Sequence, residues 1–347
     1  MAFRVLVAGG AGLVGSAVAR QLLSEGAEVA VVDALVEPGD GRAVREGRLE
    51  GLRALPRATV VVADLALPGA ASDLFRELRP GAVVNAALFP PGGPGLASML
   101  EAARSHDKPF LVHLSDAALY GAAGAPGQPA LEEEPVDPGS DPVLLQRMVE
   151  ESRLRGSDVP NVILRLFDLL APGAPANRFP QDALERLLDG DEVVLPSDAP
   201  RDLLHVDDAV HGILAALALR PAGRTINVAS GRGVAPSQLV RLLGERAFRP
   251  VRVRVEAAPV RPRRIASLAR AGELLRFRPK TSLEASVEAI VAARLGAPET
   301  STTRPRPVTP ALRPAAPRPQ ERDEPKEVSR RELFGLFRRP FDGGRSR

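Results

Sequence analysis

Three glycines at three-residue spacing lie between a short apolar run and a helical pattern near the N-terminus. The segment reads Gly9-Gly10-Ala11-Gly12-Leu13-Val14-Gly15 and follows the run at 5–8. Glycines permit a tight turn and the close approach of a pyrophosphate to the backbone, and the following helix presents its N-terminal amides to the anion. The spacing therefore predicts a dinucleotide site whose binding residues include Gly9, Gly12, Leu13, Val14 and Gly15.

A carboxylate at the end of the second predicted strand indicates which dinucleotide binds. Asp33 ends this run, 18 residues beyond Gly15. A carboxylate here accepts hydrogen bonds from the adenosine ribose and repels a 2′-phosphate, so we expect NAD. Arg42 and Arg45 lie nearby and keep NADP as the less favoured alternative. The other alternative is a purely structural turn in which Asp33 is a solvated cap.

Apolar runs alternate with helical patterns through the first 170 residues. Strands of this kind form parallel sheets covered on both faces, so the predicted fold class is α/β, a doubly wound parallel sheet of the Rossmann type. Shorter strands and helices in the second half predict a smaller mixed α/β substrate lobe, contributed mainly by residues 168–265. The predicted strands are 4–8, 28–32, 59–63, 82–85, 110–114 and 161–166, and the predicted helices include 13–24, 70–78, 206–219 and 283–295.

The amino-acid composition excludes sites that depend on cysteine and disfavours nucleic acid as a partner. The chain has no Cys, which excludes disulfides, thiolate nucleophiles and zinc–thiolate sites. The net charge of the whole chain is +3. The residues from Ser301 onward have 12 Arg and Lys against 6 Asp and Glu, a net charge of +6, so the first 300 residues carry −3. A basic nucleic-acid-binding body is not expected. Residues His205, Asp207, Asp208 and His211 match a helix start, and we predict no metal site there.

The C-terminal region differs from the rest. Residues 1–297 are predicted to form the NAD-binding domain with its lobe, and residues 298–347 a Pro- and Arg-rich disordered linker with a short amphipathic helix at 327–339. This tail is either a basic appendage or a tethered helix that docks on a protein partner or an anionic surface. No signal peptide or membrane span is evident, so the expected location is cytoplasmic.

Further motifs occur in an order that resembles a known family. Asp64-Leu65 follows the third predicted strand, Asn85-Ala86-Ala87 the fourth, and the segment from Ser115 to Gly121 the fifth. Later motifs are Arg165-Leu166-Phe167-Asp168, the segment from Arg201 to Asp208, and the segment from Leu275 to Pro279. In these features residues 3–296 resemble the extended short-chain dehydrogenase/reductases, the NAD-dependent epimerase/dehydratase family.

The resemblance implies roles for several residues in binding the cofactor and the substrate. Asp64 and Leu65 would lie at the adenine, and Ala86 and Ala87 would line the cofactor. In the family members that act on nucleotide sugars, two arginines hold the diphosphate, and here they would be Arg201 and Arg261. The resemblance also implies a homodimer.

A structural role is the alternative for the first of these arginines. Arg201 is followed closely by two carboxylates, Asp202 and Asp207, and either could form an ion pair with it. The nucleotide-sugar ligand is therefore a hypothesis.

The family's acid–base residues have no counterparts here. Members use a Tyr-x-x-x-Lys pair, whose ammonium helps to stabilise a phenolate base, together with a Ser or Thr. Alignment on the predicted helix places Pro142 at the Tyr position and Gln146 at the Lys position, and Asp116 stands at the Ser or Thr position. The only tyrosine, Tyr120, is followed four residues later by Gly124. We therefore assign no catalytic residue.

Two functions follow from this loss. The first is a binding protein or scaffold that responds to NAD or to a nucleotide sugar. The alternative is an active sugar-nucleotide epimerase, dehydratase or reductase with rearranged acid–base groups, in which Asp116 or His113 acts as the base. A histidine on a strand is more often structural, and whether the chain is an enzyme is left open.

Overall fold

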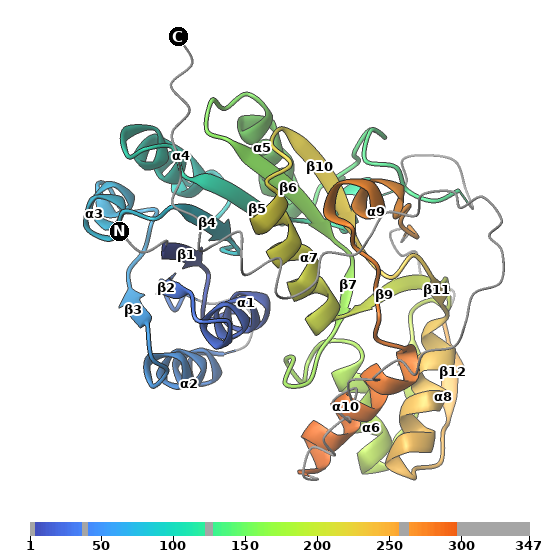
Figure 1. Cartoon of the computed structure of the whole chain (residues 1–347). Helices are drawn as coiled ribbons and strands as arrows, with labels where there is room; N and C mark the ends of the chain where they lie inside the picture. The colour runs from blue at the N-terminus through green and yellow to red at the C-terminus, as the bar shows by residue number, and fades with distance from the viewer. Residues whose placement is uncertain (1–3, 37–40, 122–127, 257–263, 297–347) are drawn as a thin grey trace, which may run out of the picture.

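The computed structural model describes residues 4–36, 41–121, 128–256 and 264–296 (Figure 1). Its main sheet has seven parallel strands in the order β10-β6-β5-β4-β1-β2-β3. The central strands are almost wholly buried and apolar, as expected for strands covered on both faces. The strands are β1 (Arg4–Ala8), β2 (Glu28–Asp33), β3 (Ala58–Val62), β4 (Ala82–Asn85), β5 (Phe110–Asp116), β6 (Asn161–Leu166) and β10 (Arg224–Val228).

The strand order reverses between β1 and β4. The chain moves outward from β1 through β2 to β3 and then returns to the other side of β1, where β4 pairs with it in the register Ala8↔Asn85. In open parallel sheets, ligands bind beyond the carboxyl ends of the strands at such a switch point. The predicted doubly wound fold is confirmed, and the glycine turn after β1 lies at this switch point.

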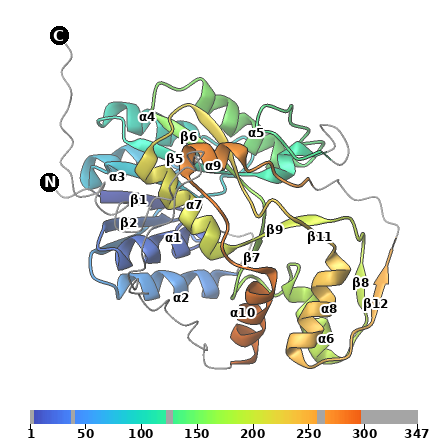
Figure 2. The same cartoon turned by 45° about the vertical axis from the view of Figure 1, so that its right-hand side comes forward.

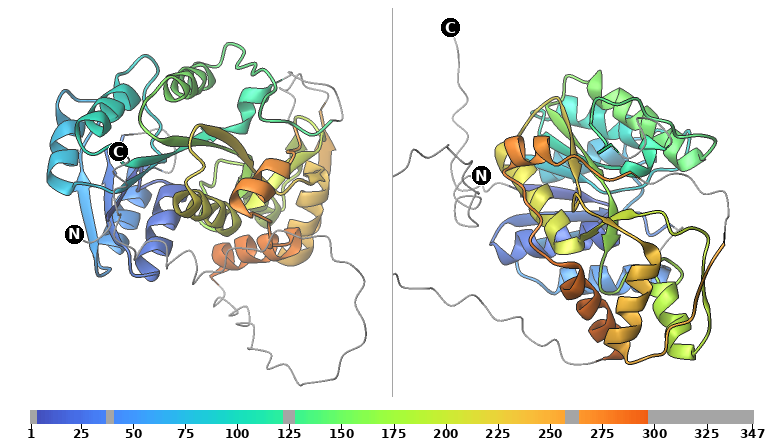
Figure 3. Two further views of the ribbon diagram at one scale, coloured as in Figure 1. Left: turned by 45° about the horizontal axis from the view of Figure 1, so that its top comes forward. Right: turned by 90° about the vertical axis from the view of Figure 1, so that its right-hand side faces the viewer.

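Helices cover both faces of the sheet (Figures 1 and 3). One apolar core lies between the sheet and α1, α2, α7 and α9, and a second lies between the opposite face and α3, α4 and α5. On the first face the helices are α1 (Leu13–Ser24), α2 (Arg42–Arg53), α7 (Val206–Leu219) and α9 (Ala269–Leu275). On the second they are α3 (Ala70–Leu78), α4 (Gly95–Ser105) and α5 (Pro142–Arg155).

A smaller lobe of mixed structure lies at one end of the sheet (Figure 2). Its helices gather around a separate apolar core, beside one two-stranded and one three-stranded sheet. The three-stranded sheet has the order β11-β9-β7. The elements are β7 (Asp168–Leu170), α6 (Gln181–Asp189), β8 (Val193–Leu195), β9 (Arg201–His205), β11 (Gly233–Val234), α8 (Pro236–Ala247), β12 (Val253–Val255) and α10 (Leu283–Leu295).

Some sequence predictions fall outside the described residues, namely the linker and helix of residues 298–347 and the candidate ligand Arg261. Across the four described ranges, no helix has both the length and the apolar character needed to cross a membrane.

Candidate functional site

The glycine turn packs tightly against the end of β4. Gly9 has φ +76°, and a Cβ atom there would lie 2.5 Å from the amide nitrogen of Ala87. A Cβ atom at Gly15 would lie 2.3 Å from the carbonyl oxygen of Gly9. Gly12 is the N-cap of α1, and no side chain caps this helix end. The turn therefore needs glycines to bring the N-terminus of α1 and the end of β4 together.

Asp33 is a buried carboxyl group beside this turn, not a solvated cap. Its side chain is only 1% exposed. Oδ2 accepts a hydrogen bond from the amide of Ala11 at 2.9 Å, and Oδ1 accepts one from the amide of Leu35 at 2.8 Å. Nη2 of Arg45 lies 2.6 Å from Oδ1. The solvated-cap alternative is therefore wrong.

Helix α2 supplies two arginines to this region, Arg45, which sequence analysis named as lying near Asp33, and Arg48, which it did not name. Arg45 pairs with Asp33, as described above. Nη1 of Arg48 donates to the carbonyl oxygen of Ala11 at 3.2 Å, and Nη2 donates to that of Gly173 at 3.0 Å. Arg48 thereby joins the glycine turn to the segment that follows β7. The spacing of three residues between two arginines was the available signal, but helix α2 itself was not predicted.

The other predicted cofactor residues lie at the ends of neighbouring strands. Asp64 follows β3, and its Oδ1 accepts from the amide of Ala66 at 2.8 Å. Leu65 is buried in the core under α3, and Ala86 and Ala87 are half-buried at the end of β4. The structure thus places the predicted residues along one edge of the sheet, from β3 to β4.

The positions aligned with the family's Tyr and Lys lie on α5 and carry no acid or base. Pro142 is the first residue of the helix, and the side chain of Asp141 caps it. Gln146 is 6% exposed; its Oε1 accepts from the amide of Gly92 at 3.1 Å, and its Nε2 donates to Glu150 at 3.2 Å. Gln146 therefore serves as a buried bridge between α5 and the segment before α4.

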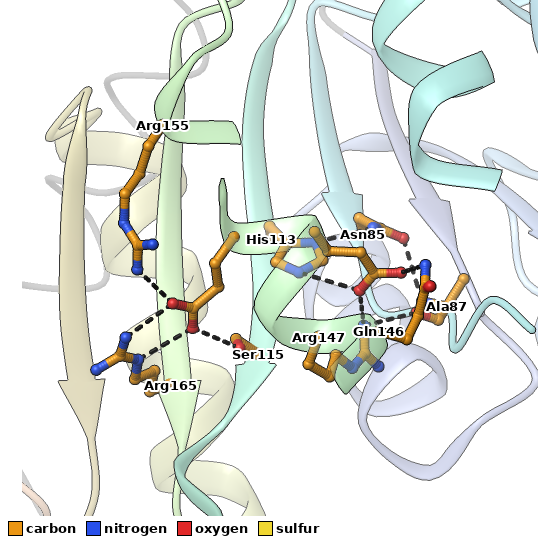
Figure 4. A network of polar contacts seen from close by, with 10 residues as sticks. Asn85, Ala87, His113, Ser115, Gln146, Arg147, Arg155 and Arg165 are labelled. Carbon is orange, nitrogen blue, oxygen red and sulfur yellow. Dashed lines mark hydrogen bonds and ion pairs between the residues drawn. The ribbon is translucent and has the colours of Figure 1, made fainter. Parts of the chain in front are cut away.

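A buried polar network connects α5 with β4 and β5 (Figure 4). Nη1 of Arg147 donates to Glu150 at 2.9 Å and to the carbonyl oxygen of Ala87 at 3.2 Å. His113 lies beneath, with Nδ1 2.9 Å from the side-chain nitrogen Nδ2 of Asn85 and Nε2 3.6 Å from Glu150. Burial, and secondarily the charge of Arg147, hold the pKa of His113 well below its usual value. The imidazole is neutral and fully buried, which is the structural role expected for a strand histidine.

A second buried carboxylate, Glu151, joins α5 to β5 and β6. It accepts from Oγ of Ser115 at 2.7 Å and from two nitrogens of Arg165 at 3.0 and 2.8 Å, and it also pairs with Arg155 (Figure 4). Burial alone would raise the pKa of Glu151, but Arg165, Ser115 and Arg155 together hold it below the usual value. Ser115 precedes Asp116, the position expected for the catalytic Ser or Thr. Its hydroxyl donates to Glu151 and is therefore already engaged within the protein.

The only tyrosine is also part of the core. Tyr120 is 0% exposed, and its hydroxyl donates to Oδ1 of Asn227 at 2.7 Å. The guanidinium of Arg165 lies 4.7 Å from the ring centroid. Burial raises the pKa of Tyr120, although Arg165 opposes the shift. This phenol cannot serve as a base for a ligand at the strand ends.

Asp116 is the exposed acidic side chain at the end of β5. Its Oδ1 accepts from the amide of Ala118 at 2.7 Å and caps the short 3₁₀ helix Ala117–Tyr120. It occupies the position that the alignment assigns to the family's Ser or Thr.

The predicted diphosphate ligand Arg201 forms an ion pair that sequence analysis did not foresee. Its Nε donates to Oδ2 of Asp168 at 2.8 Å, and its guanidinium lies 5.1 Å from the ring centroid of Phe179. Neither expected partner is used: Asp202 is buried and accepts from the amides of Ser230, Gly231 and Ala266, and Asp207 is exposed on α7. The predicted pairing with Asp202 or Asp207 is wrong, because β9 pairs in parallel with β7 and brings Asp168 alongside.

The helix start predicted at His205 is confirmed. His205 is the N-cap of α7, and its Nδ1 accepts from the amide of Asp207 at 3.2 Å. Asp208 is buried and accepts from the amides of Lys280 and Thr281. In the described part of the chain, no cluster of three His, Asp or Glu side chains is arranged to hold a metal ion.

Comparison with curated proteins finds enzymes that act on nucleotide-linked sugars. The dTDP-6-deoxy-L-talose 4-dehydrogenase (NAD(P)(+)) of Kitasatospora kifunensis is 27% identical over 279 residues, 74% of this chain and 83% of that protein. The dTDP-glucose 4,6-dehydratase of Streptomyces griseus is 29% identical over 277 residues, 71% and 79% of the two chains.

Solved structures share the fold. A UDP-glucuronic acid 4-epimerase of Bacillus cereus, in complex with a fluorinated UDP-glucuronic acid and NAD, matches with a TM-score of 0.77 at 19% identity over 85% of this chain and 99% of that one. The dTDP-glucose 4,6-dehydratase of Bacillus anthracis in complex with NAD matches with a TM-score of 0.76 at 18% identity, over 85% and 97%.

A family model matches residues 5–95 and 93–229, which include the glycine turn, Asp33, all of α5 and Arg201. The description of the family names NAD as its cofactor, in agreement with the cofactor predicted from the sequence. The chain therefore belongs to the NAD dependent epimerase/dehydratase family.

Proposed function

We propose that this protein binds NAD along the ends of β1 to β4 and a sugar nucleotide beside the smaller lobe, without the Tyr-dependent turnover of its family. The observation that carries the proposal is the glycine turn packed on Ala86 and Ala87 at the switch point, with the buried carboxylate of Asp33 beside it. Bound NAD would supply a hydride acceptor. The protein itself would supply backbone amides to the pyrophosphate and Asp33 to the ribose.

The relatives support a sugar nucleotide as the second ligand. The curated relatives are named for dTDP-linked sugars, and the Bacillus cereus epimerase was crystallised with a UDP-sugar. Arg201 is half-buried and would bind a diphosphate through charge-assisted hydrogen bonds. Asp168 already accepts from this guanidinium, so a diphosphate would compete with it.

A role in binding rather than turnover is supported by the side chains at the aligned positions of α5. Its aligned positions carry Pro142 and Gln146, and the latter is engaged within the protein. Tyr120 is buried and bound to Asn227. Neither the phenol nor the ammonium of the usual proton transfer is therefore available from these positions.

An active enzyme is the second candidate and fits the comparisons at least as well, since the relatives are named as enzymes. The observation that favours it is Asp116, an exposed carboxylate at the end of β5. A carboxylate there could take a proton from a sugar hydroxyl as hydride leaves. His113 is a poorer candidate because it is fully buried.

The two candidates are separated by calorimetry with NAD, followed by a turnover screen with UDP- and dTDP-sugars. Binding without turnover supports the binding protein. Turnover that is lost in Asp116→Asn but kept in Asp137→Asn supports the enzyme, because Asp137 is also an exposed aspartate that accepts from a nearby amide. Absence of any affinity for NAD contradicts both candidates.

Several predictions about organisation and partners belong to the same proposal. Helix α5 exposes Val143, Leu145 and Val149, each 37–40% exposed, which supports a homodimer that sedimentation can test. The boundaries of the lobe at 168 and 265, the cytoplasmic location, and a protein or anionic-surface partner for residues 298–347 stay predictions.

A further inference from the structure

Helix α2 presents positive charge to the ribose end of the proposed cofactor site. Arg45 and Arg48 lie about one helical turn apart, and both contact groups of the cofactor region, namely Asp33 and the carbonyl oxygen of Ala11. Burial, and secondarily the charge of Arg20 on α1, lower the pKa of the Arg48 guanidinium. Two guanidiniums of α2 thus lie in this region, and that of Arg45 contacts the carboxylate of Asp33 directly.

Arg45 has hydrogen-bonding capacity left over. Its Nη2 donates to Asp33, and its side chain is 16% exposed. Its Nε is buried and has no hydrogen-bond partner among the residues that the structure describes. Buried donors without partners are rare in folded proteins and call for a specific explanation. An acceptor on a bound ligand would provide one.

We infer that Arg45 allows the site to bind NADP as well as NAD. An unpaired Asp33 would repel the 2′-phosphate of NADP and exclude it. Here Arg45 balances that charge, and its planar fork suits two oxygens of a phosphate. With NAD, the ribose hydroxyls donate to Asp33 while Arg45 stays paired with it. With NADP, Arg45 turns to the 2′-phosphate. The inference rests on the proposed function, since both dinucleotides use the same turn.

Calorimetry with NAD⁺ and NADP⁺ at 0.15 M salt tests the inference on the full chain. For the unmodified protein we expect the two dissociation constants to agree within about tenfold. Arg45→Gln should weaken the binding of NADP⁺ at least tenfold and change the dissociation constant of NAD⁺ less than about threefold. The matched control is Arg53→Gln, which removes the same charge from the same helix, but from an exposed side chain in its last turn. This control should change neither constant more than about threefold.

A second variant covers the case in which Arg45→Gln does not fold, which would appear as loss of NAD⁺ binding. Arg45→Lys keeps the charge beside Asp33 but lacks the fork, so NAD⁺ binding should persist while NADP⁺ weakens severalfold.

The outcomes also separate the inference from the proposed function. NAD⁺ binding with NADP⁺ more than a hundredfold weaker overturns the inference and leaves the proposed function intact. Equal losses in Arg45→Gln and Arg53→Gln also overturn it, because the effect is then only long-range charge. Absence of binding by either dinucleotide refutes the proposed function itself.

Discussion

The neutral, buried state of His113 predicts how the stability of this protein depends on pH. The pKa of His113 is well below 6.5 in the folded protein, because of burial and the nearby Arg147. In the unfolded chain it returns to about 6.5. Below that pH the unfolded state binds a proton that the folded state does not, so the stability of the fold decreases as pH falls.

The size of the effect follows from the width of this pH window. Each pH unit below 6.5 costs about 1.4 kcal/mol for as long as the folded state excludes the proton, so the decrease from pH 6.5 to pH 5 is at most about 2 kcal/mol. Urea denaturation followed by circular dichroism at pH 7, 6 and 5 measures it. His113→Gln should be less stable than the unmodified protein at pH 7. Its free energy of unfolding should, however, decrease less steeply as pH falls, because the contribution of the histidine is gone. Comparison of the two slopes removes the contributions of the carboxyl groups that both proteins share.

The matched control is His106→Gln, which removes a half-buried histidine at the end of α4 and leaves the contribution of His113 to the pH dependence in place. Equal slopes for His113→Gln and the unmodified protein would refute the reasoning. They would mean that His113 already carries its proton in the folded state, held by Glu150 at 3.6 Å.

Three further predictions concern the site and its support. Gly15→Ala places a Cβ atom 2.3 Å from a backbone oxygen of the glycine turn, so NAD affinity should fall at least tenfold by calorimetry, whereas Gly47→Ala, at an open position on α2, should leave it unchanged. Glu151→Gln leaves a buried arginine without its charge partner and should lower the free energy of unfolding by about 3–5 kcal/mol in urea denaturation; a loss below 1 kcal/mol would contradict the burial of this pair. Asp168→Asn should free Arg201 and tighten UDP binding severalfold by calorimetry, and weaker binding would show instead that Asp168 holds the arginine in place.

The main sheet could be predicted from sequence because its strands are buried on both faces. Runs such as that of β1 are apolar throughout, and the structure places β1, β4 and β6 at the predicted bounds. Helix α2 was missed for the opposite reason. It is largely polar, and within it only Leu49 and Leu52 are buried, too few apolar residues for a visible helical period.

The site could be predicted where it depends on local spacing, and not where it depends on packing between distant elements. The glycine turn and Asp33 could be predicted because each lies at the end of a strand that the sequence pattern indicates. The pair between Asp33 and Arg45 requires α2 to lie against the end of β2. The pair between Asp168 and Arg201 joins residues 33 positions apart through the pairing of β7 with β9. No motif encodes either contact.

Helix α5 contributes two buried charges to the core of the protein. It buries two adjacent carboxylates, Glu150 and Glu151, at a desolvation cost of several kcal/mol each that only well-placed partners can offset. Those partners are Arg147 on the helix itself and Arg165 on β6. A helix committed in this way is a rigid support for β4, β5 and β6, because moving it would leave charges buried without partners. Any turnover by this protein should therefore depend on the exposed strand end at Asp116 rather than on α5.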